Sequence, residues 1–157
     1  MVELSIVIPI YKAEGCLERL HERLTTVLSS TVPSYEIILI DDSSPDDCWS
    51  ILKALAIQDT NIRAYRLSRN FGQHAAITAG LEQCQGRYAV VMDCDLQDPP
   101  EIIPQLYHQA IQGSEVVLAR RKTKRHSFFR RTTSKLYFQL LNLIIHYNRL
   151  CTNAYSQ

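Results

Sequence analysis

Short apolar runs alternate with stretches of helical periodicity from the N-terminus to residue 119, and this alternation constrains the fold more than any other feature. Several runs are rich in β-branched residues and are followed by polar or turn residues, which is typical of buried strands. The predicted strands are Leu4 to Ile10, Tyr35 to Ile40, Ile62 to Leu67, Tyr88 to Met92 and Val116 to Ala119. Strands that alternate with helices through short connections predict an α/β fold with a mostly parallel central sheet flanked by helices.

The helices between these runs are indicated by spacing and by their first residues. One apolar helix face is marked by Leu17, Leu20, Leu24, Val27 and Leu28, which recur at the helical period. Two strings that combine acidic residues with proline predict helix starts, with Ser44 and Asp98 as the capping residues.

Length and composition fit one globular domain over residues 1–157, since the chain has a 46% hydrophobic share and no internal repeat or low-complexity linker. The five cysteines form no Cys-x-x-Cys pair, which favours a reducing compartment over a disulfide framework or a zinc site. The N-terminus lacks the features of a signal peptide, and no apolar run approaches the ~20 residues that cross a bilayer. We therefore expect a cytoplasmic chain with no signal peptide and no transmembrane segment.

Charge is distributed unevenly along the chain. Residues 1–113 carry a net charge of −7, whereas residues 114–157 carry +8. Seven Lys and Arg residues lie within residues 120–131, and an amphipathic stretch with Phe129, Leu136, Leu140, Leu143 and Tyr147 near one stripe follows. A solvated loop with a core-packing helix and a basic element on an anionic membrane surface both fit this pattern. RNA binding is a third interpretation, but no RNA-binding motif accompanies the cluster, so we expect no nucleic-acid partner.

Acidic residues follow two of the predicted strands at the point where each strand ends. Asp41-Asp42 follows the second strand and Asp93-Cys94-Asp95 follows the fourth. In open parallel sheets, ligands bind beyond the carboxyl ends of the strands. Two carboxylates one residue apart can share a hard divalent cation, which then binds a diphosphate. Helix capping and turn formation are the alternative, and we prefer them for Asp46 and Asp98.

Four strings of residues come in the order that they have in family 2 glycosyltransferases. They are Val7 to Tyr11, Ile40 to Ser44, Ser68 to Gln73 and Met92 to Pro100. More narrowly, the chain resembles the polyprenyl-phosphate glycosyltransferases, the branch that includes dolichyl-phosphate mannose synthase and bacterial undecaprenyl-phosphate sugar transferases. The string Asp-x-Asp-Leu-Gln-Asp-Pro-Pro is much more specific than a bare Asp-x-Asp. The resemblance covers roughly residues 3–145.

This resemblance implies a Rossmann-like GT-A fold that binds a nucleotide-sugar, and it assigns roles to seven residues. Pro9 and Tyr11 would line the base pocket, and Asp42 would accept a hydrogen bond from the base. Asp93 would lie near the ribose and the metal, and Asp95 would ligate Mg²⁺ or Mn²⁺. Gln97 would contact the diphosphate or the sugar and complete the catalytic set with Asp93 and Asp95, while Arg121 or its neighbour Arg120 would face the phosphates.

The implied activity is inverting, metal-dependent transfer of a hexose from a UDP- or GDP-sugar to a polyprenyl phosphate. Such a protein would lie peripherally on the cytoplasmic face of the membrane and serve cell-envelope glycan synthesis or lipid glycosylation. The chain departs from the family where Lys12-Ala13-Glu14 replaces a common Asn-Glu and where residues 148–157 match nothing of the family's continuation, so it looks truncated. The alternative is a truncated, catalytically incompetent module that binds nucleotide-sugar. A nucleotidyltransferase is less well supported, because the first loop lacks the Gly-rich, Lys-containing pattern of that class. No oligomeric state follows from the sequence.

Overall fold

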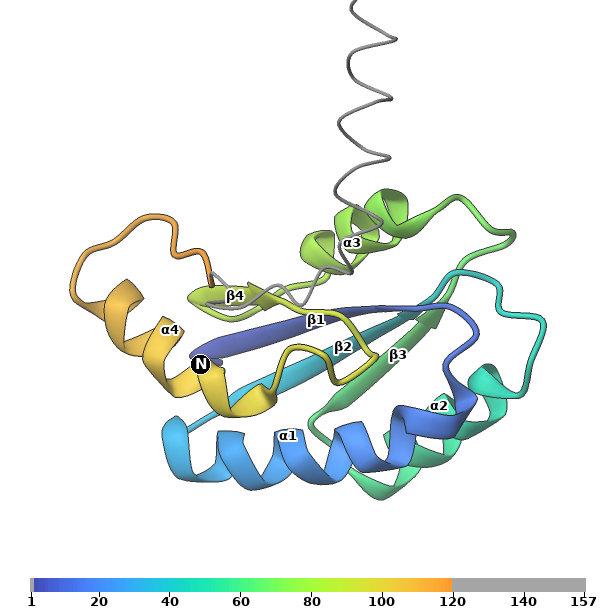
Figure 1. Cartoon of the computed structure of the whole chain (residues 1–157), viewed down its shortest axis with the longest axis horizontal. Coiled ribbons are helices and arrows are strands. Elements are labelled where there is room, and N and C mark those ends of the chain that lie inside the picture. Colours follow the sequence, from blue (N-terminus) through green and yellow to red (C-terminus); the bar gives the residue numbers. More distant parts are fainter. Residues whose placement is uncertain (1, 120–157) are drawn as a thin grey trace, which may run out of the picture. The chain divides into compact units, whose positions relative to one another are not determined.

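Four parallel strands form the central sheet of the protein in a computed structural model, which describes residues 2–119 (Figure 1). The strands are β1 (Leu4–Ile10), β2 (Tyr35–Asp41), β3 (Ile62–Arg66) and β4 (Tyr88–Val91), in the spatial order β3-β2-β1-β4. Each lies within one residue of its predicted position, so four of the five predicted strands are confirmed. The basic cluster, the amphipathic stretch and Arg121 lie outside the described residues.

The register of the sheet brings the loops that follow the strands to one edge. Ile10 pairs with Asp41, which in turn pairs with Arg66, so β1, β2 and β3 end at the same level. On the other side of β1, Val7 pairs with Val91, the last residue of β4. Since the strands are parallel, the four loops after them meet beyond the carboxyl edge of the sheet, where ligands bind in folds of this kind.

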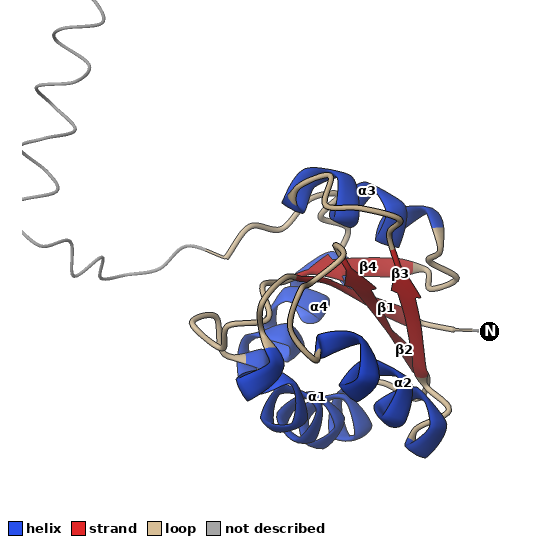
Figure 2. Ribbon diagram, turned by 90° about the vertical axis from the view of Figure 1, so that its right-hand side faces the viewer, coloured by secondary structure: helices blue, strands red, loops and turns tan. Residues whose placement is uncertain are grey.

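Helices cover both faces of the sheet (Figure 2). The helical elements are η1 (Glu14–Cys16), α1 (Leu17–Thr31), α2 (Cys48–Gln58), α3 (Gln73–Glu82), η2 (Pro100–Ile102) and α4 (Ile103–Ile111). Helices α1, α2 and α4 lie on one face, and α3 lies on the opposite face. This layered arrangement confirms the predicted α/β architecture.

The core has two parts, one on each face of the sheet. On the larger side, Leu17, Leu20, Leu24 and Leu28 are buried against the strands, which confirms the predicted apolar face of α1. On the other side, Val7, Ile38 and Ile40 pack with Ala76 of α3. Every residue of β1 is buried, which explains why β1 is apolar without alternation except at Ser5, whose hydroxyl donates to Glu36 Oε1 at 2.6 Å.

Both predicted helix caps are wrong. Helix α2 begins at Cys48 with Asp47 in the N-cap position, and no side-chain hydrogen bond caps it. Ser44 is instead buried, and its Oγ accepts a hydrogen bond from the backbone N of Lys12 at 3.2 Å. The hydroxyl is thus used by a neighbouring loop, which sequence spacing does not reveal. Likewise, Pro99 rather than Asp98 occupies the N-cap of η2.

The fifth predicted strand, Val116 to Ala119, is also wrong. Residues 116–119 pair with no strand of the described part of the chain. The side chains of Val116 and Leu118 are 78% and 86% exposed. An apolar run forms a strand only where a neighbouring strand offers its backbone N–H and C=O groups.

Across residues 2–119, no helix combines the length and apolar character needed to cross a bilayer.

Candidate functional site

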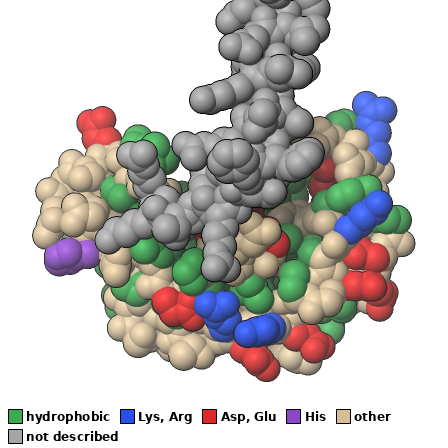
Figure 3. Space-filling model, viewed as in Figure 1, with side chains coloured by type: hydrophobic (Ala, Val, Ile, Leu, Met, Phe, Trp, Pro, Cys, Tyr) green, Lys and Arg blue, Asp and Glu red, His purple; other side chains and the backbone are tan. Residues whose placement is uncertain are grey.

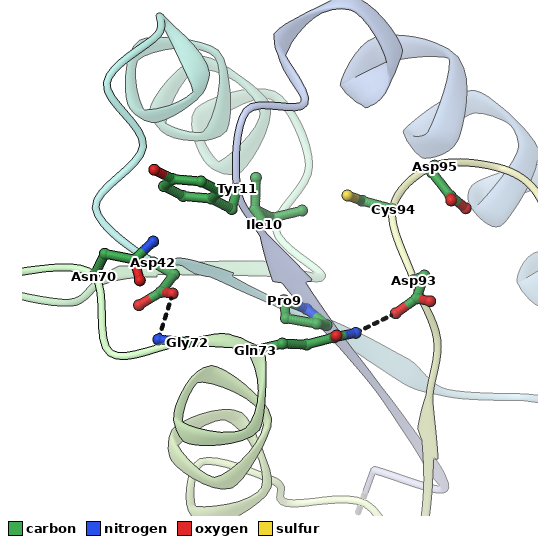
Figure 4. Close-up of a pocket in the computed structure, with 10 residues that line it drawn as sticks. All are labelled: Pro9, Ile10, Tyr11, Asp42, Asn70, Gly72, Gln73, Asp93, Cys94 and Asp95. Atoms are coloured by element: carbon green, nitrogen blue, oxygen red, sulfur yellow. Dashed lines mark hydrogen bonds between the residues drawn. The ribbon is translucent and has the colours of Figure 1, made fainter. Parts of the chain in front are cut away.

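A pocket of about 330 Å³ lies among the loops that follow the four strands (Figure 4). Each of these loops or strand ends contributes to its wall. The lining residues are Pro9, Ile10, Tyr11, Asp42, Asn70, Gly72, Gln73, Asp93, Cys94 and Asp95. The space-filling view shows acidic, basic and hydrophobic side chains mixed over the part of the surface that it leaves uncovered (Figure 3).

The pocket has two chemically different ends. At one end lie the Tyr11 ring, Asp42 and Asn70, and at the other lie Asp93, Cys94 and Asp95. Pro9 and the Gln73 side chain lie between the two ends. An elongated ligand with a planar ring at one end and anionic groups with a cation at the other matches this distribution of side chains.

The aromatic end is built by the loop after β1. The Tyr11 side chain is 45% exposed although it borders the pocket, so one surface of its ring is available for stacking. The ammonium of Lys12 lies 5.4 Å from the centre of this ring. Lys12 itself has a φ of 52°, a left-handed conformation that turns the chain sharply after Tyr11.

Asp42 holds the loop that precedes α3. Its carboxylate accepts hydrogen bonds from the backbone N of Phe71, at 2.8 Å to Oδ1, and from the backbone N of Gly72, at 2.9 Å to Oδ2. Asp42 is 3% exposed, so these two bonds lie in a dry environment. Gly72 has a φ of +91°, which favours glycine. Asp42 thus borders the pocket, as expected, and also fixes the shape of its wall.

The acidic end is formed by the loop after β4. Asp93 Oδ1 accepts a hydrogen bond from Gln73 Nε2 at 2.7 Å. Asp95 Oδ1 accepts one from the backbone N of Gln97 at 3.0 Å, across Leu96 with its φ of 59°. Each carboxylate therefore has one oxygen engaged in orienting it and a second oxygen as a potential ligand.

The carboxylates of Asp93 and Asp95 fit a hard divalent cation in their chemistry, because Mg²⁺ and Mn²⁺ prefer oxygen ligands. Residues 2–119 contain no group of three or more His, Cys, Asp or Glu side chains placed to hold a metal. Among the described residues, Asp93 and Asp95 would thus supply two ligands to a cation here, and water or a phosphorylated ligand could supply others. Mg²⁺ sites that use one or two carboxylates with substrate phosphates have this composition.

Left-handed backbone conformations are found in all four loops at this edge. Lys12, Ser43 and Leu96 have φ values of 52°, 56° and 59°, and Gly72 has 91°. Each follows a different strand. Non-glycine residues in this region cost of order 1 kcal/mol or more and cluster at functional sites. Their concentration around one pocket makes this edge the candidate functional end of the sheet.

The cysteines near the pocket are neutral thiols. Burial raises the pKa of Cys94 to about 11, helped by the nearby Cys16. The Cys16 Sγ donates to the backbone O of Cys94 at 3.2 Å, and burial raises its pKa as well. A thiol that stays protonated at neutral pH is a poor nucleophile. We therefore assign both cysteines a packing role.

The structure brings together most of the residues that the sequence singled out. Pro9, Tyr11, Asp42, Asp93 and Asp95 all line the pocket. The exposed Gln97 is not among the lining residues, although its backbone N donates to Asp95 Oδ1. The site also contains residues to which the sequence assigned no role, namely Ile10, Asn70, Gly72, Gln73 and Cys94. Asn70, Gly72 and Gln73 lie in the Ser68 to Gln73 string, so its match to the family was the sequence signal that could have identified them as site residues.

Comparison with known proteins identifies the family. The model of the family described as "Glycosyl transferase family 2" matches residues 5–155. The undecaprenyl-phosphate 4-deoxy-4-formamido-L-arabinose transferase of Pseudomonas fluorescens is 46% identical over 134 residues, which are 85% of this chain and 39% of the relative. The uncharacterized glycosyltransferase YkcC of Bacillus subtilis is 38% identical over 142 residues, which are 90% of this chain and 44% of the relative. The chain thus spans about two fifths of the length of the curated relatives that it matches.

Solved structures show the same fold at low sequence identity. Staphylococcus aureus TarS in complex with UDP has a TM-score of 0.52 at 22% identity, over 60% of this chain and 28% of that chain. The mannosyltransferase PcManGT of Pyrobaculum calidifontis, in complex with GDP-Man and Mn²⁺, has a TM-score of 0.54 at 17% identity, over 59% of this chain and 27% of that chain. These likenesses confirm the expected GT-A type of fold. Together with the four sequence strings and the match over residues 5–155, they show that the chain belongs to glycosyl transferase family 2.

Proposed function

We propose that this chain binds a nucleotide-sugar in the pocket at the carboxyl edge of the sheet and transfers its sugar to a polyprenyl phosphate. The observation that carries the proposal is the polarity of the pocket, with an accessible Tyr11 ring at one end and the Asp93 and Asp95 carboxylates at the other. A nucleotide-sugar has a matching arrangement. Its planar base can stack on the Tyr11 ring, and its diphosphate can bind a cation that the carboxylates hold.

The donor would lie along the pocket with its base at the Tyr11 end. A planar base gains stacking energy on an aromatic ring, and Pro9, which lies between the two ends of the pocket, adds an apolar surface. Asp42 lies at this end with its two oxygens already bonded to backbone N–H groups. A carboxylate oxygen has a second lone pair, so an N–H group of the base could donate to Asp42 without displacing the bonds from Phe71 and Gly72.

The diphosphate would lie at the Asp93 and Asp95 end. A divalent cation held by these two carboxylates would neutralise charge on the diphosphate as it leaves. The chain's own task there is to present the two carboxylates to the cation, and the bonds from Gln73 and from the Gln97 backbone orient them. We assign Arg121, and Gln97 through its side chain, to the diphosphate as proposals.

In the transfer step, a phosphate oxygen of the acceptor attacks the anomeric carbon of the donor sugar. The bond from that carbon to the oxygen of the diphosphate breaks, and the nucleoside diphosphate departs with the electron pair. Attack opposite the leaving group gives inversion, which is consistent with the family. The acceptor phosphate is already anionic, so the reaction needs no strong general base.

The names of the relatives support the acceptor class, because several are undecaprenyl-phosphate transferases. Those names carry an arabinose derivative, which is a five-carbon sugar, so the donor sugar is either a hexose or a modified pentose. UDP and GDP are both retained as the nucleotide. A lipid acceptor places the reaction at a membrane, and we propose peripheral attachment at its cytoplasmic face through the basic cluster at residues 120–131.

A transfer assay tests the proposal. The 157-residue chain is incubated with undecaprenyl phosphate, Mn²⁺ and radiolabelled UDP- or GDP-sugars, and label in the organic phase is counted. We expect label in the lipid fraction for one donor and none for the Asp95→Ala variant. Donor binding without lipid product would favour the alternative of a non-catalytic nucleotide-sugar module. Absence of both binding and transfer would refute the proposal.

A further inference from the structure

A side-chain hydrogen bond joins the middle of the pocket to its acidic end. Gln73 Nε2 donates to Asp93 Oδ1 at 2.7 Å, as the dashed line in Figure 4 shows. Gln73 is the first residue of α3, and Asp93 is in the loop after β4. The bond therefore ties the helix on one face of the sheet to the acidic loop beyond its edge.

The position of Gln73 is fixed by its neighbours on both sides. Before it, Gly72 occupies the N-cap of α3 with its φ of 91°, and its backbone N is held by the buried carboxylate of Asp42. After it, α3 packs closely on the sheet, since a Cβ on Gly80 would lie 2.4 Å from Cγ1 of Val7. Gln73 thus projects from a rigid element, and a donor on such an element can orient a partner at little entropic cost.

An amide suits this place for an electrostatic reason. It donates a hydrogen bond to the carboxylate but adds no charge, so Asp93 keeps its full negative charge for a cation. A Lys or Arg at position 73 would also donate, but its positive charge would offset that of Asp93 and repel a divalent ion. Hydrogen-bond partners that orient a ligating side chain typically change metal affinity by 10 to 100-fold when they are removed.

We propose that Gln73 is a positioning residue, which holds the Asp93 carboxylate in the orientation that binds the divalent cation of the donor complex. The inference rests on the proposed function for its biological meaning. Its physical content, however, is a coupling between Gln73 and cation binding that can be measured without any nucleotide. It also gives a role to the Ser68 to Gln73 string, which ends on this residue.

The test compares three variants of the full chain with the wild type. Gln73→Met keeps the length of the side chain and removes the donor, and Gln73→Lys keeps a donor and adds a charge. Thr78→Met is the matched control, because it places the same side chain at an exposed position of α3 that is not among the pocket residues. Binding of Mn²⁺ alone is measured by electron paramagnetic resonance, and binding of UDP and of GDP with Mn²⁺ is measured by calorimetry.

We expect Gln73→Met to weaken Mn²⁺ binding about tenfold, Gln73→Lys to weaken it further, and Thr78→Met to leave it within about twofold of the wild type. Wild-type affinity for Mn²⁺ in Gln73→Met would overturn the inference, as would a wild type that binds no Mn²⁺. A wild type that binds Mn²⁺ but neither UDP nor GDP would instead refute the proposed function, and the Mn²⁺ comparison would still decide the role of Gln73.

A second measurement covers the case in which Gln73→Met folds poorly. The side-chain amide resonances of Gln73 are compared between the wild type and Asp93→Ala by ¹H–¹⁵N correlation spectroscopy. Loss of the acceptor should move these resonances to the values of a solvated glutamine. Identical resonances in the two proteins would show that the bond is absent in solution and would overturn the inference.

Discussion

The two hydrogen bonds that Asp42 accepts lead to a prediction that separates its structural role, holding the loop before α3, from its proposed role in binding the base. Asp42→Ala removes an acceptor from the backbone N of Phe71 and from that of Gly72, which lie 2.8 and 2.9 Å from the carboxylate oxygens. Hydrogen bonds to a charged group contribute about 1.5 to 3 kcal/mol each. Phe71 is half exposed, so water can solvate part of what is lost, and the lower value applies. We expect the free energy of unfolding to fall by about 3 kcal/mol, from a total that is typically 5 to 15 kcal/mol.

Asp42→Asn is the matched variant, because it keeps the shape of the side chain and one acceptor oxygen. Its amide nitrogen must face one of the two backbone N–H groups, so we expect roughly half of the loss seen with alanine. Urea denaturation measures both values. The single tryptophan, Trp49, packs against the core and provides the fluorescence signal.

Nucleotide affinity is measured on the same two proteins. If Asp42 acted only on the base, Asp42→Ala would lose affinity and keep the stability of the wild type. A change in unfolding free energy below about 0.5 kcal/mol, the usual size for a surface substitution, would therefore refute the structural role of Asp42 in holding the loop before α3. If Asp42 does hold this loop, stability and nucleotide affinity fall together, since the loop forms a wall of the pocket.

Four further predictions concern other parts of the chain. Asp95→Ala should abolish Mn²⁺-dependent binding of UDP-glucose or GDP-mannose in calorimetry, and unchanged affinity would remove Asp95 from the site. Burial alone would raise the pKa of Glu36, but hydrogen bonds from Ser5, Gln85 and Arg63 outweigh it and lower that pKa below its ordinary value. A carboxyl whose pKa is lower in the folded state stabilises the protein above its unfolded pKa of about 4.3, and this contribution is lost as the pH falls through the folded value. The stability difference between wild type and Glu36→Gln should thus be complete at neutral pH and shrink in denaturation experiments at progressively lower pH, whereas a difference independent of pH would contradict it. Gly86→Ala should lower the melting temperature, because its Cβ would lie 2.7 Å from the backbone N of Ser5 in β1, and such overpacking costs about 1 to 3 kcal/mol; an unchanged melting temperature would show that the backbone yields. Replacing cations of the basic cluster by Gln should weaken flotation with anionic liposomes at low salt by about 1 kcal/mol per residue, and a wild type that ignores such liposomes would end the membrane proposal. The residues to replace are Lys122, Lys124, Arg125 and Arg130.

Most of the architecture could be predicted from the sequence because strands and helices leave periodic apolar patterns. The leucines at positions 17, 20, 24 and 28 recur at the helical period and all four are buried. The run Leu4 to Ile10 is apolar at every position except Ser5 because helices cover both faces of β1. The placement of the acidic residues at one edge could be predicted too, since the carboxyl ends of parallel strands lie at the same edge of a sheet. Asp42, Asp93 and Asp95 accordingly line one pocket.

The predictions that were wrong depended on what lies nearby in space. Ser44 has the sequence context of a helix cap, but its hydroxyl is bonded to the backbone of Lys12, 32 residues away. Val116 to Ala119 has the composition of a strand, but a strand also needs a partner edge, and residues 116–119 have none within the described part of the chain.

The sequence by itself determined the order of β1 to β4 and their helices along the chain, the family and the acidic edge of the sheet, because each of these follows from local pattern. Only the tertiary structure decided which polar groups pair across that edge. Nothing in the sequence places the Gln73 amide on Asp93 or the Asp42 carboxylate on the backbone of Phe71 and Gly72. These bonds join loops that follow different strands, and their geometry depends on the register of the sheet and on the left-handed turns between its elements. A hydrogen bond requires two groups within about 3 Å, and only the packed chain sets distances of that size.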